Sequence, residues 1–371
     1  MENNNDNKVL NVPHLRFPEF SGEWKKCKLG DLCNVLMCKR ILVSQTNTED
    51  GVPFYKIGTI GSTPDAYISK ELFDDYKVKY NYPRKGEVMI TCAGTVGKCV
   101  VYDGEDAYFQ DSNIVWIDNP TQYISNGFLF HLLSKVDWRK LNSTTIIRIY
   151  NDDLRNLKMS YPRKEEQQKI SHLLSLLDER IATQNKIIEK LQSLIKGLAA
   201  QLTQSGTPNI RLCDCLECHS STLLENCVSV TGSYPVYGAT GLIGYTNNYA
   251  YNGESILIVK DGSGVGSLSY VNDHFSVIGT LNYLTAKENY SILYLYYALM
   301  AFNFTPYITG MAIPHIYFKD YGKAKLFYPS IEKRIRIASL LHNIEQKLVV
   351  EQNLVISLST QKSYLLRMLF I

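Results

Sequence analysis

The sequence of 371 residues has no long apolar run and almost no excess of charge of either sign. No segment reaches the ~18 consecutive apolar residues that a membrane-spanning helix needs. The first residues, MENNNDNK, have no apolar core that would serve as a signal peptide. The formal net charge is +3, which is too small for a protein that binds polyanions indiscriminately. We therefore expect a soluble, cytoplasmic protein that does not bind a membrane.

Cysteine is present, but its pattern does not indicate a disulfide framework. The nine cysteines are an odd number in a chain of this size, which suits a reducing cytosol. Five potential metal ligands stand close together at Cys213, Cys215, Cys218, His219 and Cys227. Structural zinc sites use two separated pairs of ligands rather than such a crowded group. We therefore expect reduced thiols and no metal site.

The most regular feature of the sequence is a heptad repeat over residues 161–206. Its apolar positions alternate steps of four and three, which is typical of a coiled coil. These positions are Ile170, Leu174, Leu177, Ile181, Ile188, Leu191, Ile195, Leu198 and Leu202, with Gln184 in the one gap. A helix over residues 163–205 would be roughly 64 Å long at ~1.5 Å per residue. Such a helix needs a partner that covers its apolar face.

A second copy of the heptad occurs 167 residues later, within residues 328–371. Glu351 stands at the position of Gln184, and Lys362 at the position of Ile195, so two seam positions of the second helix are polar. The second helix begins at the far end of the first one, so it must run back to bury its stripe. This predicts an antiparallel pair. The central seam residues are Leu174, Leu177, Ile181, Ile188 and Leu191 on one helix and Ile344, Leu348, Val355 and Leu358 on the other.

The two segments that precede the long helices also resemble each other. The first segment has short β-like runs near residues 52–57, 87–92, 98–102 and 113–117 and a helix near 126–141. The second segment has β-like runs near residues 255–259, 267–271 and 280–284 and a helix near 291–302. Gly86-Glu87 and Ile149-Tyr150 recur as Gly253-Glu254 and Ile316-Tyr317, again 167 residues on. We therefore expect two copies of one α/β domain.

The expected order along the chain is a disordered tail, globule, helix, globule and helix. The boundaries are residues 1–11, 12–160, 161–206, 207–327 and 328–371.

Three stretches of this sequence resemble the DNA-specificity subunit of type I restriction–modification systems. They are VPHLRFPEFSGEWKKCKLGDL from Val12, YPRKEEQQKISHLLSLLDERI from Tyr161 and YPVYGATGLIGYTN from Tyr234. The helix start Pro-x-x-x-Glu-Gln-x-x-Ile is intact in the first copy from Pro162, whereas Arg334 stands in the Gln position of the second copy. The resemblance extends over nearly the whole chain and preserves the order of its parts.

The resemblance implies an α/β (α+β) fold in which two target recognition domains are separated by two antiparallel coiled-coil helices with pseudo-twofold symmetry. Each domain would recognise one half of a split sequence in double-stranded DNA. The helices would set the spacing and dock two methyltransferase subunits, and restriction subunits would join the complex. The family places S-adenosylmethionine, ATP and Mg²⁺ on those partners, so we expect this chain to bind no cofactor and to be non-catalytic.

A third heptad column is apolar in both helices, although a two-stranded coil needs only two columns. It consists of Leu173, Ile187, Leu194, Leu340, Leu354 and Met368. The surplus predicts that another surface covers this column. That surface is either a methyltransferase subunit or the flanks of the globules themselves.

Candidate DNA contacts are basic, aromatic and histidine side chains in the two globules. We select Lys39, Arg40, Lys56 and Arg148 in the first and Tyr237, Lys260, His315 and Lys319 in the second. Residues 13–160 contain 19 basic against 18 acidic residues, and residues 207–327 contain six against eight. Because phosphate contacts supply most affinity, we expect the partners to contribute much of the grip on DNA.

Two other functional classes remain to be weighed. A fused or relic methyltransferase or nuclease would use Asn119-Pro120-Thr121-Gln122-Tyr123, or Pro64-Asp65 with Asp75-Tyr76-Lys77, but both motifs are incomplete. The glycine-rich residues 262–266 lack the Lys-Ser or Lys-Thr of a phosphate-binding loop, and residues 92–98 lack its first Gly. A coiled-coil scaffold without a DNA role would leave the repeated globules unexplained.

Overall fold

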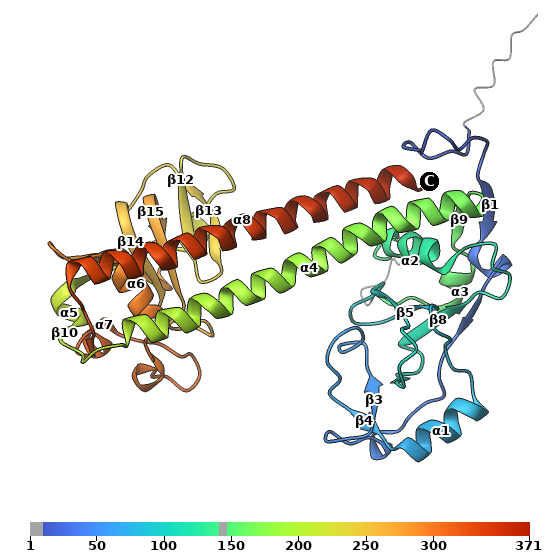
Figure 1. The fold of residues 1–371 in the computed structure, drawn as a ribbon, viewed down its shortest axis with the longest axis horizontal. Coiled ribbons are helices and arrows are strands. Elements are labelled where there is room, and N and C mark those ends of the chain that lie inside the picture. The colour runs from blue at the N-terminus through green and yellow to red at the C-terminus, as the bar shows by residue number, and fades with distance from the viewer. Residues whose placement is uncertain (1–9, 141–146) are drawn as a thin grey trace, which may run out of the picture. The chain divides into compact units, whose positions relative to one another are not determined.

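The computed structural model describes residues 10–140 and 147–371 (Figure 1). The chain forms two compact units. Unit 1 consists of Met1–Thr183 and Val355–Ile371, and unit 2 consists of Gln184–Leu354. Each unit contains one α/β globule and a segment of each of the two long helices. None of the helices in the described ranges is long and apolar enough to cross a membrane.

Both expected long helices are present. α4 extends over 40 residues, Lys164–Thr203, and α8 over 39 residues, Ile331–Leu369. Proline precedes each helix, and the first turn of each carries glutamate, which favours the positive end of the helix dipole. At ~1.5 Å per residue, α4 is about 60 Å long.

In unit 2, the segments of α4 and α8 run in opposite directions. Gln184, only 2% exposed, donates a hydrogen bond from Nε2 to the carboxylate of Glu351. Further along α4, Ala199 packs in one apolar cluster with Ile337 and Leu341, which precede Glu351 on α8. Gln184 and Glu351 are the same position of the 167-residue repeat, so the repeat contacts itself there. Gln184 and Glu351, both polar residues of the seam, are therefore hydrogen-bonded to each other.

In unit 1, the other segments of the two helices pair in the same antiparallel sense. Ile170 and Leu174 share the globule's core with Leu369 near the end of α8. Lys362, the second polar seam residue of α8, pairs with Asp178. Lys362 and Asp178 are both partly exposed, so water and the ion pair together stabilise the charge of Lys362. Both polar positions that the sequence places in the seam of α8 therefore have a partner on α4.

The central sheets of the two globules have the same strand order, as expected for two copies of one domain. In unit 1 the order is β2 (Asn34–Leu36), β8 (Ile114–Asp118), β5 (Val88–Thr91) and β6 (Cys99–Val101). In unit 2 it is β11 (Leu216–Ser220), β16 (Leu281–Ala286), β14 (Tyr251–Val259) and β15 (Leu268–Val277), continued by β12 (Tyr234–Gly238) and β13 (Gly241–Thr246). Equivalent two-stranded pairs are β1 (Lys25–Lys28) with β9 (Lys158–Tyr161) and β10 (Ile210–Arg211) with β17 (Lys325–Leu326).

Both globules also contain a second antiparallel strand pair beside the central sheet. In unit 1, β3 (Val52–Tyr55) pairs with β4 (Tyr67–Ile68) and in parallel with β7 (Tyr108–Phe109), and with α1 (Lys70–Lys79) these strands enclose a separate apolar cluster around Phe73. In unit 2, β12 pairs in the same way with β13 and with the end of β15. The turn between β12 and β13 uses Gly241 at a φ of 102°, a conformation that suits glycine. Short helices complete the two globules: α3 (Asn151–Arg155), α5 (Leu212–Cys215) and α7 (Phe318–Tyr321).

One helix of each globule packs near the long helices. α2 (Asn126–Lys135) contributes Phe128 to the core that contains Leu174, and α6 (Ile292–Met300) shares a core with Leu341. The hydroxyls of Tyr296 and Tyr297 donate to the two carboxylate oxygens of Glu345 on α8, at 2.8 and 2.7 Å. Burial raises the pKa of both tyrosines, so the phenols remain neutral donors.

Two boundaries differ from the expected ones. The helix expected to reach residue 141 ends at Lys135, because Val136 is extended and the chain turns to bury Trp138 in the core. Residue 141 lies outside the described residues, as do residues 1–9 of the expected tail. Asn11, also in that expected tail, is buried and donates to the backbone oxygen of Trp24 at 2.7 Å.

The seam can be tested with a matched pair of substitutions on α4. Leu191 is half-buried at a seam position, whereas Leu194 is 46% exposed. Leu191→Glu should lower the free energy of unfolding by about 1–3 kcal/mol, because a carboxylate would enter the apolar seam. Leu194→Glu should change it by less than about 0.5 kcal/mol. Urea unfolding followed by helical circular dichroism measures both, and equal effects of the two changes would contradict this seam.

Candidate nucleic-acid interface

Two of the four basic candidates of unit 1 line one cavity, and a third binds the backbone of a lining residue. The cavity has a volume of about 310 Å³ and is lined by Arg40 and Lys56 together with the amides of Gln110 and Asn113. Arg148 approaches the same segment, since its Nη2 donates to the backbone oxygen of Ser112, another lining residue, at 3.0 Å. Cations and amides around one cavity are the groups that contact phosphates and base edges.

The cations of this cavity are held by weak, exposed contacts. Arg40 pairs with Asp111 at 2.9 Å, and Lys56 pairs with Asp65 at 2.9 Å. Exposed ion pairs contribute little to stability, so a phosphate can replace the carboxylate partner at small cost. Ser112 has a φ of 54°, a strained conformation for a residue other than glycine, which is often found at functional sites.

Lys39, the fourth candidate of unit 1, does not line this cavity. It is exposed, and its ammonium lies 5.4 Å from the ring centroid of Tyr80. A cation held over an aromatic ring remains able to contact a phosphate, so Lys39 stays a separate candidate.

Three of the four candidates in unit 2 lie at one end of its sheet. The backbone N–H of Ile316 donates to the oxygen of Lys260 at 2.9 Å, which places His315 beside the turn after β14. The His315 ring lies 4.9 Å from that of Tyr317, and the Lys319 ammonium lies 5.1 Å from the centroid of the same Tyr317 ring. We call Lys260, His315 and Lys319 the cation row of unit 2.

The cation row and Arg148 occupy equivalent places in the repeat. Arg148 precedes Ile149, whose N–H donates to the oxygen of Cys92 after β5, just as Ile316 binds Lys260 after β14. The turns that follow these strands are hairpins with glycine at positive φ, Gly97 in unit 1 and Gly266 in unit 2. Each globule therefore presents basic or histidine side chains beside the same hairpin turn.

Tyr237, the remaining candidate in unit 2, belongs to an apolar cluster. It is half-buried and its ring lies 6.4 Å from that of Phe275, at a T-shaped angle. Burial raises the pKa of its hydroxyl. The structure does not bring Tyr237 together with the cation row.

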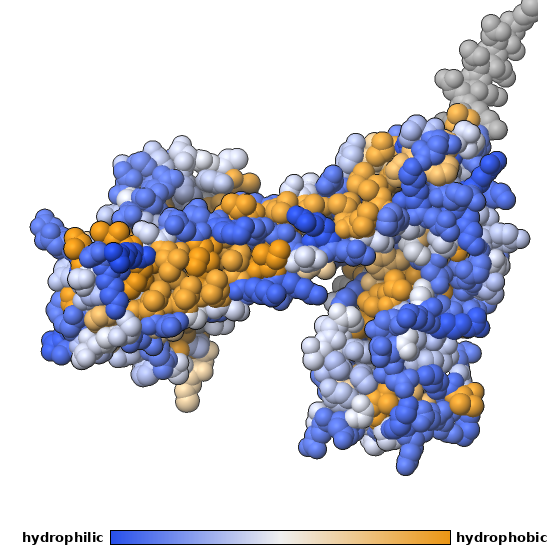
Figure 2. All heavy atoms as spheres, in the orientation of Figure 1, coloured by the Kyte–Doolittle hydropathy of each residue, from blue (hydrophilic) through white to orange (hydrophobic). Residues whose placement is uncertain are grey.

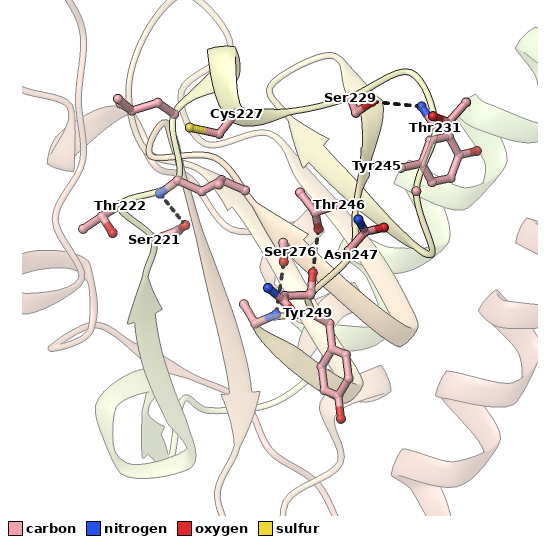
Figure 3. Close-up of a pocket in the computed structure, with 15 residues that line it drawn as sticks. Ser221, Thr222, Cys227, Ser229, Thr231, Tyr245, Thr246, Asn247, Tyr249 and Ser276 are labelled. Carbon is pink, nitrogen blue, oxygen red and sulfur yellow. Dashed lines mark hydrogen bonds between the residues drawn. The ribbon is translucent and has the colours of Figure 1, made fainter.

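A second cavity in unit 2 escaped prediction from the sequence. It is a groove of about 910 Å³ at the outer side of β13 (Figure 3). Its polar side chains are uncharged: Ser221, Thr222, Cys227, Ser229, Thr231, Tyr245, Thr246, Asn247, Asn248, Tyr249 and Ser276. The available sequence signal was the absence of Lys and Arg between Arg211 and Lys260, in a stretch rich in Ser, Thr and Asn.

The incomplete enzyme motifs are held in structural contacts. Asn119 is buried, and its amide donates to the oxygens of Ile124 and Asn126 at 2.6 and 2.9 Å. The acidic and basic residues of the nuclease-like motif pair with other residues, Asp65 with Lys56 and Asp75 with Lys79. Residues 262–266 form the turn between β14 and β15. Asn119, Asp65 and Asp75 are thus engaged in contacts within the globule.

The crowded cysteines do not form a metal centre in the structure. Burial raises the pKa of Cys215 to about 12 and that of Cys218 to about 11, so both thiols are protonated at neutral pH. Across residues 10–140 and 147–371, no group of three or more His, Cys, Asp or Glu side chains is arranged to hold a metal ion.

The third heptad column differs between the units. In unit 1, Leu173 packs against the core of the globule. In unit 2, Ile187, Leu194 and Leu340 are 37%, 46% and 47% exposed. Figure 2 shows a continuous hydrophobic area over the segments of α4 and α8 in this unit. Exposed apolar patches of this kind are typical of protein–protein contacts.

The sequence matches a known family model twice. The model for the type I restriction modification DNA specificity domain matches residues 21–193 and 210–358. A protein of Haemophilus influenzae assigned as a type I restriction enzyme specificity subunit is 46% identical over 189 residues, which cover 51% of this chain and 46% of that protein. The EcoprrI specificity subunit of Escherichia coli is 28% identical over 112 residues, 30% of this chain and 28% of the other. The chain thus spans less than half the length of these two curated relatives.

Solved structures share the fold along nearly the whole chain. The S subunit of a type I restriction–modification system from M. genitalium has a TM-score of 0.67 at 18% identity, covering 97% of this chain and 99% of that one. A chain from a type I restriction–modification complex has a TM-score of 0.52 at 16% identity, covering 95% and 98%. The chain therefore belongs to the family of the type I restriction modification DNA specificity domain, which it carries in two copies.

Proposed function

We propose that this chain is the DNA-recognition subunit of a type I restriction–modification complex, and that each globule recognises one half of a split DNA target. The observation that carries this proposal is the repeat of one DNA specificity domain, with cationic side chains beside the same hairpin turn in both copies. Two similar domains that recognise separate half-sites account for the repeated architecture better than a single binding site does.

In each globule, the cations contact DNA phosphates. Arg40, Lys56 and Arg148 supply the cations of unit 1, while Gln110 and Asn113 supply amides that suit base edges. In unit 2 the cation row supplies the phosphate contacts. The small number of cations in each globule means that the partner subunits contribute to DNA affinity.

The long helices set the distance between the two half-sites. α4 is about 60 Å long, and contacts on one face of B-DNA recur at ~34 Å intervals. A separation of about one to two helical turns between half-sites matches this length. Because the polar seam residues favour one register of the pair, the spacing preference should be narrow.

The exposed apolar column of unit 2 docks a methyltransferase subunit. Two methyltransferase subunits and restriction subunits assemble with this chain in the cytoplasm. The partner subunits bind S-adenosylmethionine, ATP and Mg²⁺. This chain recognises the DNA and does not catalyse a reaction. Purified alone, the chain should transfer no methyl group from S-adenosylmethionine to DNA.

Docking can be tested with charged substitutions in the column. Ile187→Glu combined with Leu194→Glu should reduce co-purification of the methyltransferase subunit at least tenfold, because two carboxylates would be desolvated at the contact. Leu176→Glu, also on α4 and at a site that is 49% exposed but outside the column, is the matched control. Equal retention of the partner by both variants would show that the column is not the docking surface.

Modular recognition can be tested by exchanging one globule. Replacing residues 13–160 with the corresponding segment of another family member should change one half of the methylated sequence and leave the other half intact. The reason is that the contacts of each cavity lie within one globule. Base-resolved methylation mapping of cells that express the complex gives the result, and a change in both halves would contradict modular recognition.

A further inference from the structure

We propose that the uncharged groove of unit 2 recognises base edges in the half-site of this globule, with Asn247 as a residue that determines sequence preference. The groove is the cavity of about 910 Å³ beside β13. This inference rests on the DNA-recognition function proposed above and adds the chemistry and the side chains of one half-site.

The groove has the polarity of a base-recognition surface and lacks the charge of a phosphate-binding one. No charged side chain lines it, and the sequence has no Lys or Arg between Arg211 and Lys260. Contacts to the DNA backbone depend on cations, whereas hydroxyl and amide side chains distinguish bases by their donor and acceptor patterns. The apolar side chain of Val230, 90% exposed and between two lining residues, suits the methyl group of thymine.

Hydrogen bonds organise the loops of the groove. Ser229 Oγ accepts from the N–H of Thr231 at 3.3 Å, and Ser276 Oγ accepts from the N–H of Ala250 at 3.1 Å. Thr246 Oγ1 donates to the backbone oxygen of Asn248 at 2.5 Å and closes the turn that carries Asn247. These contacts define the backbone without using the amide of Asn247.

The amide of Asn247 is available to a ligand. Its side chain is exposed, and it makes no hydrogen bond with any other residue in the described part of the chain. Figure 3 shows Asn247 directly after Thr246 at the end of β13, on the same side of the groove as Tyr245. An asparagine amide can bind the N6 and N7 positions of adenine with two hydrogen bonds. Asn247 therefore has the chemistry that selects one base.

The groove is connected through backbone contacts to the cation row. Gly279 N donates to the oxygen of Leu223, a lining residue, at 2.9 Å, and Lys260 N donates to the oxygen of the next residue, Thr280, at 3.0 Å. Lys260 in turn binds the segment of His315 through its own backbone oxygen. Asn247 itself precedes the nine-residue strand β14, and Lys260 follows it. At ~3.3 Å per residue this strand is about 30 Å long, so the cation row and Asn247 would contact the DNA at separate positions.

The groove is built on a hairpin that has a counterpart in the other copy of the domain. β12 pairs antiparallel with β13 and in parallel with the end of β15, just as β3 pairs with β4 and with β7 in unit 1. A shared scaffold gives both globules the same way of approaching DNA. Different half-sites require different side chains. The groove beside β13 has no charged lining residue, whereas the cavity beside β3 in unit 1 includes Arg40 and Lys56.

The test uses the assembled complex with its methyltransferase subunits and base-resolved methylation mapping. Asn247→Ala should reduce discrimination at one base position of one half-site by about tenfold to a hundredfold, as expected for loss of a bidentate contact. Thr231→Val, which removes a hydroxyl and keeps the side-chain volume, should relax a position in the same half-site. Asn272→Ala is the matched control, since Asn272 is exposed on β15 and does not line the groove.

The outcomes separate this inference from the proposed function. A wild-type complex whose methylation does not depend on this chain contradicts the proposed function itself. A split target that is recognised by the wild type and unchanged by both groove substitutions overturns only the role of the groove. Complete loss of methylation in an assembled Asn247→Ala complex also overturns it, because the loss of one base contact should relax one position and leave binding in place.

Discussion

The pairing of two long amphipathic helices is the constraint on which the rest of the structure depends. Each helix carries an apolar stripe that it cannot bury alone, and the seam between them includes three polar residues. Gln184 binds Glu351, and Lys362 binds Asp178, so every polar seam residue has a partner only when the helices run antiparallel in this register. Buried polar contacts of this kind are known to specify helix register. The hydroxyls of Tyr296 and Tyr297 then attach the globule of unit 2 to α8 through Glu345.

The repeat separates what the two globules share from what distinguishes them. The common sheet, the hairpin turn and the neighbouring Arg148 or His315 form the same frame in both copies. The strand β3 borders a cavity with cations and amides in unit 1, and the equivalent hairpin of β12 and β13 borders an uncharged groove in unit 2. In unit 2, the cation row follows the end of β14, whereas Asn247 precedes the start of that strand. Under the proposed function, base contacts by uncharged groups would give sequence selectivity to a protein whose net charge is only +3.

The sequence predicts the helices far better than it predicts the binding surfaces. A heptad pattern over some forty residues determines which face of α4 and of α8 is apolar and where each helix begins and ends. The 167-residue offset predicts that the globules share a fold. The shared offset also directs attention to Arg148 and His315, which do lie beside equivalent turns. Tyr237 has the chemistry of a base-contacting residue, but its packing against Phe275 is a tertiary property that no local sequence pattern reports. The groove that contains Asn247 is formed by loops and strand ends between residues 221 and 276. Polar residues so far apart in the sequence form no periodic pattern from which the groove could be predicted.

The most direct test of the helix pairing is a double-mutant cycle with Gln184→Leu and Glu351→Leu. The two side chains contact each other only if α4 and α8 are antiparallel in the observed register. Urea unfolding of the wild type, both single variants and the double variant gives their coupling free energy. We expect a coupling free energy of about 1–2 kcal/mol. The double variant should therefore lose less free energy of unfolding than the two single variants lose together. Effects that add to within about 0.3 kcal/mol would contradict the pairing.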